Sequence, residues 1–218
     1  MCGRYALHAH PDVVALQFGL SAVPQFRPRY NIAPTQAAPV VRLDAQQRRE
    51  LALLRWGLVP SWAKDPSMGA RMINARAETV AEKPAYRNAF RRRRCLVPAD
   101  GYYEWKAEAG RKQPYLLLLE SGEPFAMAGL WEQWRSAEGE LAETYAILTT
   151  EAAGTAKRVH ERMPVILAPR DYESWLVGAD PGALLKPCTE LAFAARPVST
   201  RVNNPRNDDP QCLEEAKG

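Results

Sequence analysis

A nearly unbroken series of β-rich segments between residues 95 and 150 most constrains the fold of this chain. The segments are rich in branched and aromatic residues and are separated by Gly, Pro and charged residues, which is the pattern of strands. Because such strands must bury their apolar faces together, the sequence predicts an α+β domain with a mainly antiparallel, barrel-like β-sheet core and peripheral short helices. The expected strands are Ala38–Leu43, Glu50–Trp56, two within Cys95–Lys106 around a turn at Asp100-Gly101, Pro114–Glu120, Pro124–Trp134, Thr144–Thr150 and Leu191–Ala195.

Short helices are expected around this sheet. The clearest is Pro11–Phe18, because Pro11 fits the first turn, Asp12 suits the helix dipole and Gly19 fits a C-terminal stop. The segment from Pro24 to Thr35 is expected to be an extended, rigid loop because it carries three prolines. Other helices are expected at Pro84–Arg91, Ala152–Val159, Asp171–Val177 and Gly182–Leu185.

The length of 218 residues suits one domain, which we place at residues 2–210 with a C-terminal tail at 211–218. Hydrophobic content of 46% and charged content of 25% are ordinary for a soluble globular protein. No apolar run approaches the ~18–20 residues of a membrane span, and the first residues lack the pattern of a signal peptide. A cytoplasmic location is therefore expected, with no membrane partner.

The formal net charge is +4, and arginines outnumber lysines. This balance permits a polyanionic partner, and Arg suits bidentate contacts with phosphate. The run Arg91–Arg94 predicts either a solvated surface or a patch that follows phosphates. The three histidines and four cysteines do not have the spacing of a zinc site, so neither a metal nor a cofactor is expected.

Cys2 directly follows the initiator Met1, and small second residues generally permit removal of that Met. The product would carry an amine with a pKa of about 7.7–8.0 next to a thiol of about 8.5. We expect the nearby Arg4 to lower the thiol pKa further. An aldehyde forms an imine with such an amine, and the thiol then closes a thiazolidine ring. The alternative is that Cys2 is a frayed terminal residue.

Two further segments place polar groups where they could serve such chemistry. Asn74, Arg76 and Glu78 alternate with apolar residues and share one face if the segment is extended. Glu104 points either to solvent or into an apolar pocket, where burial would raise its pKa and make it a proton donor. His160 lies between a helical stretch and a strand, where functional side chains often emerge, although a lone His is more often structural.

Trp62 stands on a polar loop rich in helix and strand breakers. An exposed Trp there is a candidate for stacking on a nucleic acid base, whereas an anchor in the core is the commoner role of Trp.

A series of motifs in this order resembles the SOS response-associated peptidase family, which includes bacterial abasic-site crosslinking proteins. The resemblance extends from residue 1 to beyond residue 200, and Cys in second position makes it specific. The motifs are Met1–Tyr5, Tyr30–Thr35, Arg55–Trp62, Asn74–Thr79, Arg94–Trp105, Ala128–Glu132, Ile147–Thr150, His160–Leu167 and Val202–Asn204.

The resemblance implies an enzyme of the hydrolase or lyase type that acts in the DNA damage (SOS) response. It would be a monomer that binds single-stranded DNA or single-strand/double-strand junctions. It would be located in the cytoplasm and associate with the nucleoid when bound to DNA. Its mature N-terminal Cys would crosslink covalently to an abasic site through a thiazolidine, after autoproteolytic removal of Met1.

The resemblance also assigns roles to residues. Cys2 is the nucleophile, Asn74 orients the amine or the opened sugar, Glu104 is the general acid/base and His160 is a proton shuttle. The DNA-binding residues that it implies are Arg4, Arg76 and Arg162 on flanking phosphates and Trp62 and Trp105 for stacking or wedging.

The sequence departs from the family at two places. Glu161 stands where members often have Asp, which keeps the charge. Ala153 stands where many carry Asn, which removes one DNA or backbone contact from that loop.

Two other classes of function remain open. The first is a cysteine peptidase that acts on other proteins, with Cys2 and His160 as nucleophile and base. The second is a non-covalent reader of single-stranded or modified DNA built from Arg and aromatic side chains.

Overall fold

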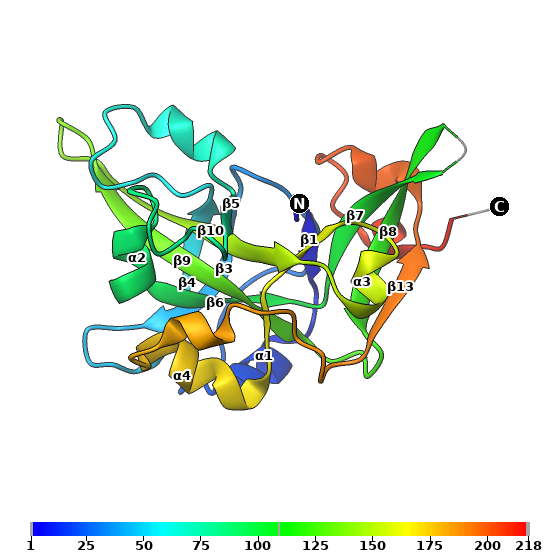
Figure 1. Ribbon diagram of the computed structural model, residues 1–218, viewed down its shortest axis with the longest axis horizontal. Coiled ribbons are helices and arrows are strands. Elements are labelled where there is room, and N and C mark those ends of the chain that lie inside the picture. Colours follow the sequence, from blue (N-terminus) through cyan, green and yellow to red (C-terminus); the bar gives the residue numbers. More distant parts are fainter. Residues whose placement is uncertain (1, 109, 217–218) are drawn as a thin grey trace.

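The computed structural model describes residues 2–108 and 110–216, which form two β-sheets with short helices around them (Figure 1). The strands are β1 Tyr5–Leu7, β2 Arg29–Ile32, β3 Ala37–Leu43, β4 Arg49–Trp56, β5 Asn74–Arg76, β6 Arg94–Ala99, β7 Gly101–Glu108, β8 Arg111–Leu119, β9 Phe125–Arg135, β10 Leu141–Glu151, β11 Arg162–Pro164, β12 Ile166–Leu167 and β13 Phe193–Pro197. The helices are α1 Pro11–Phe18, α2 Arg87–Arg92, α3 Gly154–Lys157 and α4 Tyr172–Val177, with 3-10 helices η1 Pro66–Arg71, η2 Pro169–Asp171, η3 Pro181–Leu184, η4 Thr200–Asn203 and η5 Pro210–Leu213.

Five strands of the larger sheet close into a barrel. β4, β3, β6 and β9 follow one another through antiparallel pairs. β10 closes the ring, because it pairs antiparallel with β9 and parallel with β4. The short strands β5, β11 and β12 extend this sheet at its edges. The predicted barrel-like core is therefore confirmed, with one parallel pair within a mainly antiparallel ring.

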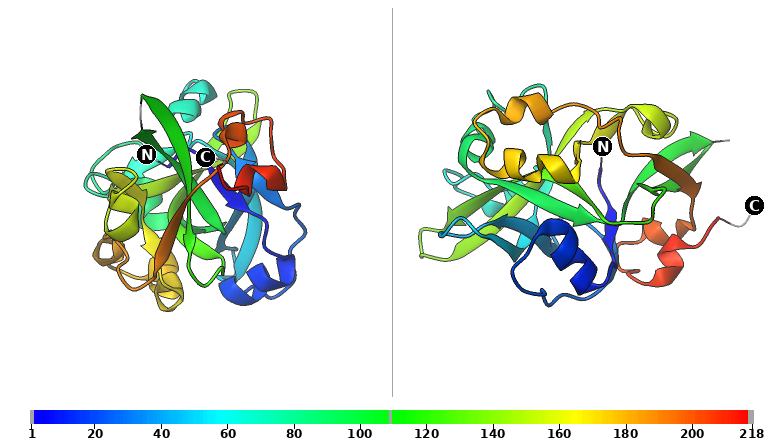
Figure 2. Two further views of the ribbon diagram at one scale, coloured as in Figure 1. Left: turned by 90° about the vertical axis from the view of Figure 1, so that its right-hand side faces the viewer. Right: turned by 90° about the horizontal axis from the view of Figure 1, so that it is seen from below.

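The second sheet contains the N-terminal strand. Its order is β13-β8-β7-β1-β2, and all its pairs are antiparallel. Figures 1 and 2 show β1 lying between the barrel and the β7–β8 hairpin. The residues at the start of the chain are thus held at the junction of the two sheets.

The two strands predicted on either side of Asp100 are confirmed as β6 and β7, and they belong to different sheets. β6 pairs with β3 and β9 in the barrel, whereas β7 pairs with β1 and β8 in the second sheet. The Asp100 carboxylate fixes this crossing point, since it accepts hydrogen bonds from the backbone amides of His8 and Ala9. The chain therefore passes from one sheet to the other at this point.

The helices agree with the sequence where local signals are strong. α1 has the predicted bounds, and Gly19 ends it with a left-handed φ of 64°. α2 begins at Arg87 instead of Pro84, because residues 84–86 form a turn. α3 begins at Gly154 instead of Ala152. The φ of +53° at Gly154 is not helical, so the helix cannot extend back to the preceding residues.

Two other expectations change in the structure. The segment from Pro24 to Thr35 is not all loop, because Arg29–Ile32 forms β2 against β1. Residues 211–216, expected as a tail, pack against the second sheet and bury Cys212. The domain bounds themselves stay a prediction. Among the helices that the structure describes, none has the length and apolar character needed to cross a bilayer.

The arginine run 91–94 has members with different roles. Arg94 is buried and donates hydrogen bonds to carbonyl groups at the C-terminal ends of two helices. In α2 the acceptors are Phe90 at 2.9 Å and Arg91 at 3.1 Å, and beyond α4 the Gly178 carbonyl accepts at 2.8 Å. A cation is favourable there because the last carbonyls of a helix are otherwise unpaired and carry negative partial charge. Arg91 and Arg92 are exposed.

Arg94→Met is therefore expected to lower the free energy of unfolding by about 3 kcal/mol, because several buried carbonyls lose their donor. Urea denaturation followed by circular dichroism measures this loss as a lower midpoint at unchanged slope. The exposed Arg92→Met is the matched control, with an expected change within about 0.5 kcal/mol. Equal midpoints for the two variants would contradict the capping role.

Candidate functional site

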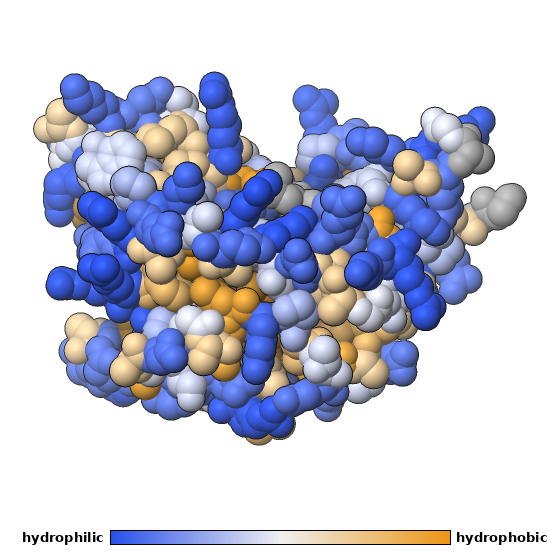
Figure 3. Space-filling view, in the orientation of Figure 1, coloured by the Kyte–Doolittle hydropathy of each residue, from blue (hydrophilic) through white to orange (hydrophobic). Residues whose placement is uncertain are grey.

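Several of the residues singled out from the sequence line one open pocket. Its volume is about 490 Å³, and it lies where the second sheet meets the segment after α3 and the C-terminal loop. The surface in Figure 3 is hollowed on the side where the N-terminus emerges in Figure 1, between the η1 segment and the β7–β8 hairpin. The lining residues are Arg4, Glu104, Trp105, Lys112, His160 and Asn203.

Cys2 is fully buried beside this pocket, which excludes the frayed terminus considered from the sequence. The Asn74 side-chain amide donates to the Cys2 carbonyl oxygen at 2.8 Å. Asn74 is itself held by the pairing of β5 with β10, opposite Ile147, and its own carbonyl accepts from the Tyr86 hydroxyl at 3.1 Å. The structure thus brings Cys2 and Asn74 together, and the Asn74 amide holds the backbone of Cys2.

The environment of the Cys2 thiol is the reverse of the one expected. Burial raises its pKa well above the usual value, and the nearby negative charge of Glu104 raises it further. Arg4 does not offset this effect, because its guanidinium donates instead to Asn31 Oδ1 at 2.9 Å and to the Val202 carbonyl at 2.8 Å. The prediction that Arg4 lowers the thiol pKa is wrong, and the buried thiol favours its protonated form.

Glu104 takes the buried one of its two possible orientations. Its side chain leaves β7 on the side of Cys2, and the residue is 4% exposed. Burial raises the pKa of its carboxyl group, and His160 acts in the opposite direction when its ring is protonated. A carboxyl group with a raised pKa holds its proton nearer to neutral pH, which suits a general acid.

His160 follows α3 and reaches the same pocket. Its Nδ1 accepts a hydrogen bond from the backbone amide of Arg162 at 2.9 Å. Because Nδ1 is the acceptor, the neutral ring carries its proton on Nε2. The ring can therefore exchange a proton through its other nitrogen while its orientation stays fixed.

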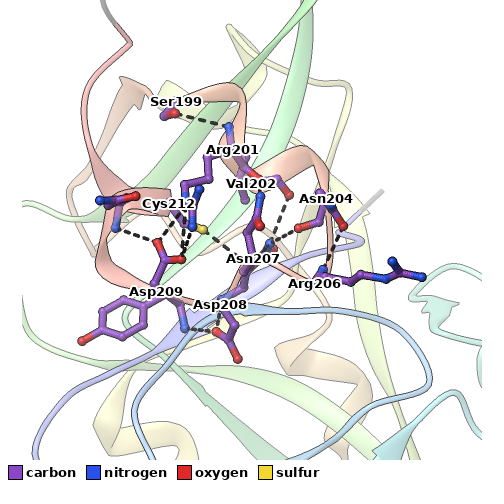
Figure 4. Close-up of polar contacts among 12 residues, drawn as sticks. Ser199, Arg201, Val202, Asn204, Arg206, Asn207, Asp208, Asp209 and Cys212 are labelled. Atoms are coloured by element: carbon purple, nitrogen blue, oxygen red, sulfur yellow. Dashed lines mark hydrogen bonds and ion pairs between the residues drawn. The ribbon is translucent and has the colours of Figure 1, made fainter.

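The C-terminal loop, residues 199–213, holds Arg4 in place. Figure 4 shows Arg201 and Asp209 turned toward each other and Asp208 turned toward the backbone of β2, whereas Arg206 points away from them. Buried Asn31 accepts from Arg4 and donates to the carbonyls of Val202, Asn204 and Asn207 at 2.7–3.2 Å. These contacts join the beginning of the chain to a segment about two hundred residues away.

Trp105 forms another wall of the pocket. Its Nε1 donates to Asn203 Oδ1 at 2.7 Å, and the Arg4 guanidinium carbon lies 5.8 Å from the centre of its ring. Asn203 and Lys112 line the pocket although sequence reasoning assigned them no role. Asn203 lies within the family motif Val202–Asn204, which could have indicated a role at the site. Nothing in the sequence near Lys112 distinguishes it from other surface lysines.

The other predicted DNA-binding residues lie outside the pocket lining. Trp62 is 60% exposed on the loop before η1, so it is not a core anchor. Arg76 is exposed at the end of β5. Arg162 is engaged within the protein, because its guanidinium pairs with both oxygens of Glu78 and donates to the Thr149 carbonyl at 2.7 Å.

Comparisons with known proteins agree on one family. The model of "SOS response associated peptidase (SRAP)" matches residues 1–205. The abasic site processing protein YoqW of Bacillus subtilis is 40% identical over 98% of this chain and 99% of its own length. The abasic site processing protein HMCES of Gallus gallus is 37% identical, over 87% of this chain and 66% of its own.

A solved structure supports the same assignment. A protein from Bacteroides thetaiotaomicron superposes with a TM-score of 0.86 at 27% identity, over 99% of this chain and 100% of that one. The match of sequence motifs, barrel and second sheet extends over nearly the whole length. The chain belongs to the SOS response associated peptidase family.

Proposed function

We propose that this protein recognises abasic sites in single-stranded DNA and forms a thiazolidine crosslink through Cys2 after Met1 has been removed. The names of the relatives support abasic site processing. The observation that carries the proposal is the placement of Cys2, held by Asn74, beside the buried carboxyl group of Glu104. The crosslink would shield the lesion while the damage is repaired.

The reaction begins with opening of the abasic sugar. The closed hemiacetal does not react with amines, so the Glu104 carboxyl protonates the ring oxygen O4′ as C1′ becomes an aldehyde. The neutral Cys2 amine attacks C1′, and the carbinolamine loses one water to give an imine. His160, with the proton of its neutral ring on Nε2, exchanges protons in these steps.

Ring closure completes the crosslink. The Cys2 S–H adds across the imine, so that sulfur bonds to C1′ and the thiol proton ends on nitrogen. This step removes the iminium that β-elimination requires, which leaves the DNA strand intact. Asn74 contributes by holding the Cys2 carbonyl, so that the amine and the thiol keep one orientation toward the sugar.

Binding of the DNA strand rests on cations and aromatic rings around the pocket. Arg4 and Lys112 face the lesion pocket, and exposed Arg76 can contact a flanking phosphate. Trp105 and exposed Trp62 offer surfaces for stacking or for a wedge at a junction. Arg162 would reach a phosphate only by leaving Glu78. Binding by such groups is sensitive to salt and blind to sequence.

Removal of Met1 is proposed to use the same groups. The Cys2 thiol lies next to the bond to be broken, and Glu104 and His160 can exchange the protons that this hydrolysis requires. A peptidase acting on other proteins is less well supported, because the Cys2 thiol is fully buried and its pKa is raised. A non-covalent DNA reader would need neither Cys2 nor its amine.

Intact mass spectrometry tests the proposal directly. The purified protein is measured alone and after incubation with a single-stranded oligonucleotide that carries one abasic site. We expect loss of Met1 and a mass gain equal to the oligonucleotide minus one water, because ring closure expels nothing further. A processed protein that binds the oligonucleotide without any covalent gain would favour the non-covalent reader instead.

A further inference from the structure

One buried hydroxyl beside the site lacks a partner in the described part of the fold. Tyr102 is fully buried, and within residues 2–108 and 110–216 nothing forms a hydrogen bond with its hydroxyl oxygen. Burial of an unpaired hydroxyl costs free energy. Neighbouring tyrosines avoid this cost, since the hydroxyls of Tyr5 and Tyr145 pair at 2.6 Å and Tyr103 donates to the Tyr30 carbonyl at 2.7 Å.

The position of Tyr102 relates it to the reacting groups. It precedes Glu104 by two residues on β7, so both side chains leave the same face of the strand. In the adjacent strand it lies opposite Tyr5, three residues after Cys2. Burial raises the pKa of the Tyr102 hydroxyl, and the negative charges of Cys2 and Glu104 raise it further. Tyr102 therefore keeps its proton and can serve as a hydrogen-bond donor.

Cys2 needs such a donor when its sulfur becomes negative. Four ionisable side chains interact electrostatically with the charge of Cys2. They are Glu104 and Tyr102 from β7, Tyr5 from β1 and Tyr145 from β10. Glu104 destabilises a thiolate, and the hydroxyls of Tyr5 and Tyr145 already pair with each other. Arg4 points to Asn31 and the Val202 carbonyl. Of these tyrosines, Tyr102 is the one whose hydroxyl pairs with no described residue.

We propose that the Tyr102 hydroxyl donates a hydrogen bond to the Cys2 sulfur during closure of the thiazolidine ring. The inference rests on the proposed function and adds a catalytic group to it. As the C1′–S bond forms, the π electrons of the imine take up a proton at nitrogen. That proton leaves the thiol through the Glu104 carboxylate, which had given its own proton to O4′. Tyr102 keeps its proton throughout and stabilises the sulfur while it carries charge.

The variant Tyr102→Phe tests this role, because it removes the hydroxyl and keeps the ring. Processed protein is mixed with an oligonucleotide containing one abasic site and is quenched at short times with or without borohydride, which traps the imine. Loss of a hydrogen bond to a charged group predicts ring closure slowed by about tenfold or more. We expect an early adduct that survives heating only after borohydride, whereas the wild type gives a heat-stable adduct in both quenches.

The folding stability of the same variant separates this role from a structural one. Because the deleted hydroxyl has no partner among residues 2–108 and 110–216, Tyr102→Phe is expected to unfold at the same or a higher temperature than the wild type. Tyr103→Phe on the opposite face is the control: it loses a hydrogen bond, so it melts lower but forms no extra imine.

Two results would overturn the inference. One is ring closure in Tyr102→Phe at the wild-type rate, and the other is a melting temperature of Tyr102→Phe below that of the wild type. A wild-type protein that forms no adduct in either quench would instead refute the proposed function itself.

Discussion

Cys2→Ala is expected to convert the protein from one that protects an abasic site into one that cuts the DNA strand there. Because the proposed self-removal of Met1 uses the Cys2 thiol, Met1 is removed from this variant with a methionine aminopeptidase. The freed N-terminal amine still forms the imine with C1′. Without the thiol, no ring closes, and the iminium promotes β-elimination. Denaturing electrophoresis of a labelled oligonucleotide should show loss of the heat-stable adduct, together with a new cleavage product.

The remaining thiols supply the control for this result. Cys188 is partly exposed and lies away from the pocket, so Cys188→Ala should crosslink like the wild type. Borohydride should restore a covalent band for Cys2→Ala, because reduction fixes the imine. A heat-stable adduct formed by Cys2→Ala without reduction would rule out the thiazolidine.

Glu104→Gln is expected to slow crosslinking by about 10²–10⁴-fold, because ring opening loses its proton donor. The pH dependence should change as well. In the wild type, burial raises the pKa of Glu104, so the acid form is lost as pH rises through that raised value. The amine acts in the opposite direction, since it becomes neutral as pH rises toward about 7.7–8.0. The wild-type rate should thus be bell-shaped, and the variant should keep only the rising limb.

Stability gives an independent check on the same variant. A raised carboxyl pKa means that folding favours the protonated form, so this contribution is fully present below the unfolded pKa of about 4.3 and is lost as pH rises through the folded pKa. Gln cannot ionise, so Glu104→Gln should be more stable than the wild type at neutral pH while reacting more slowly. Glu108→Gln, at the far end of the same strand and outside the pocket lining, should leave the rate unchanged. A bell-shaped rate profile in Glu104→Gln would assign the acid to another group.

Local signals in the sequence predicted local structure well. The bounds of α1 followed from Pro11 and Gly19, because both residues act through the backbone angles of their own segment. The pairing partners of the two strands around Asp100 could not be predicted in the same way. Which strand β7 pairs with depends on the distant β1 and β8, and no local pattern contains that information.

The alternation of polar and apolar residues along β7 does not predict which way Glu104 points. Both faces of β7 are buried, since Tyr102 packs in the main core and Tyr103 in a second cluster with Val202 and Cys212. An apolar residue on either side of Glu104 is therefore compatible with either orientation. Only the three-dimensional structure decides that the carboxyl group faces Cys2.

The site could be assembled from the sequence only through the family resemblance. Cys2, Asn74, Glu104 and His160 are separated by long stretches of chain, and spacing alone does not bring them together. Lys112 escaped notice because an exposed lysine at the start of a strand is ordinary. The direction of the Arg4 side chain was also beyond the sequence, since its partners Asn31 and Val202 meet it only in the folded protein.

The contact between Arg4 and the Val202 carbonyl has a consequence for biosynthesis. The two residues are 198 positions apart, so a ribosome makes the reactive end of the chain long before it makes the segment that completes the pocket. The nascent chain carries Cys2 without the surroundings that hold Arg4, Trp105 and Asn203 in register. The pocket around Cys2 is thus completed only after translation has passed the C-terminal loop.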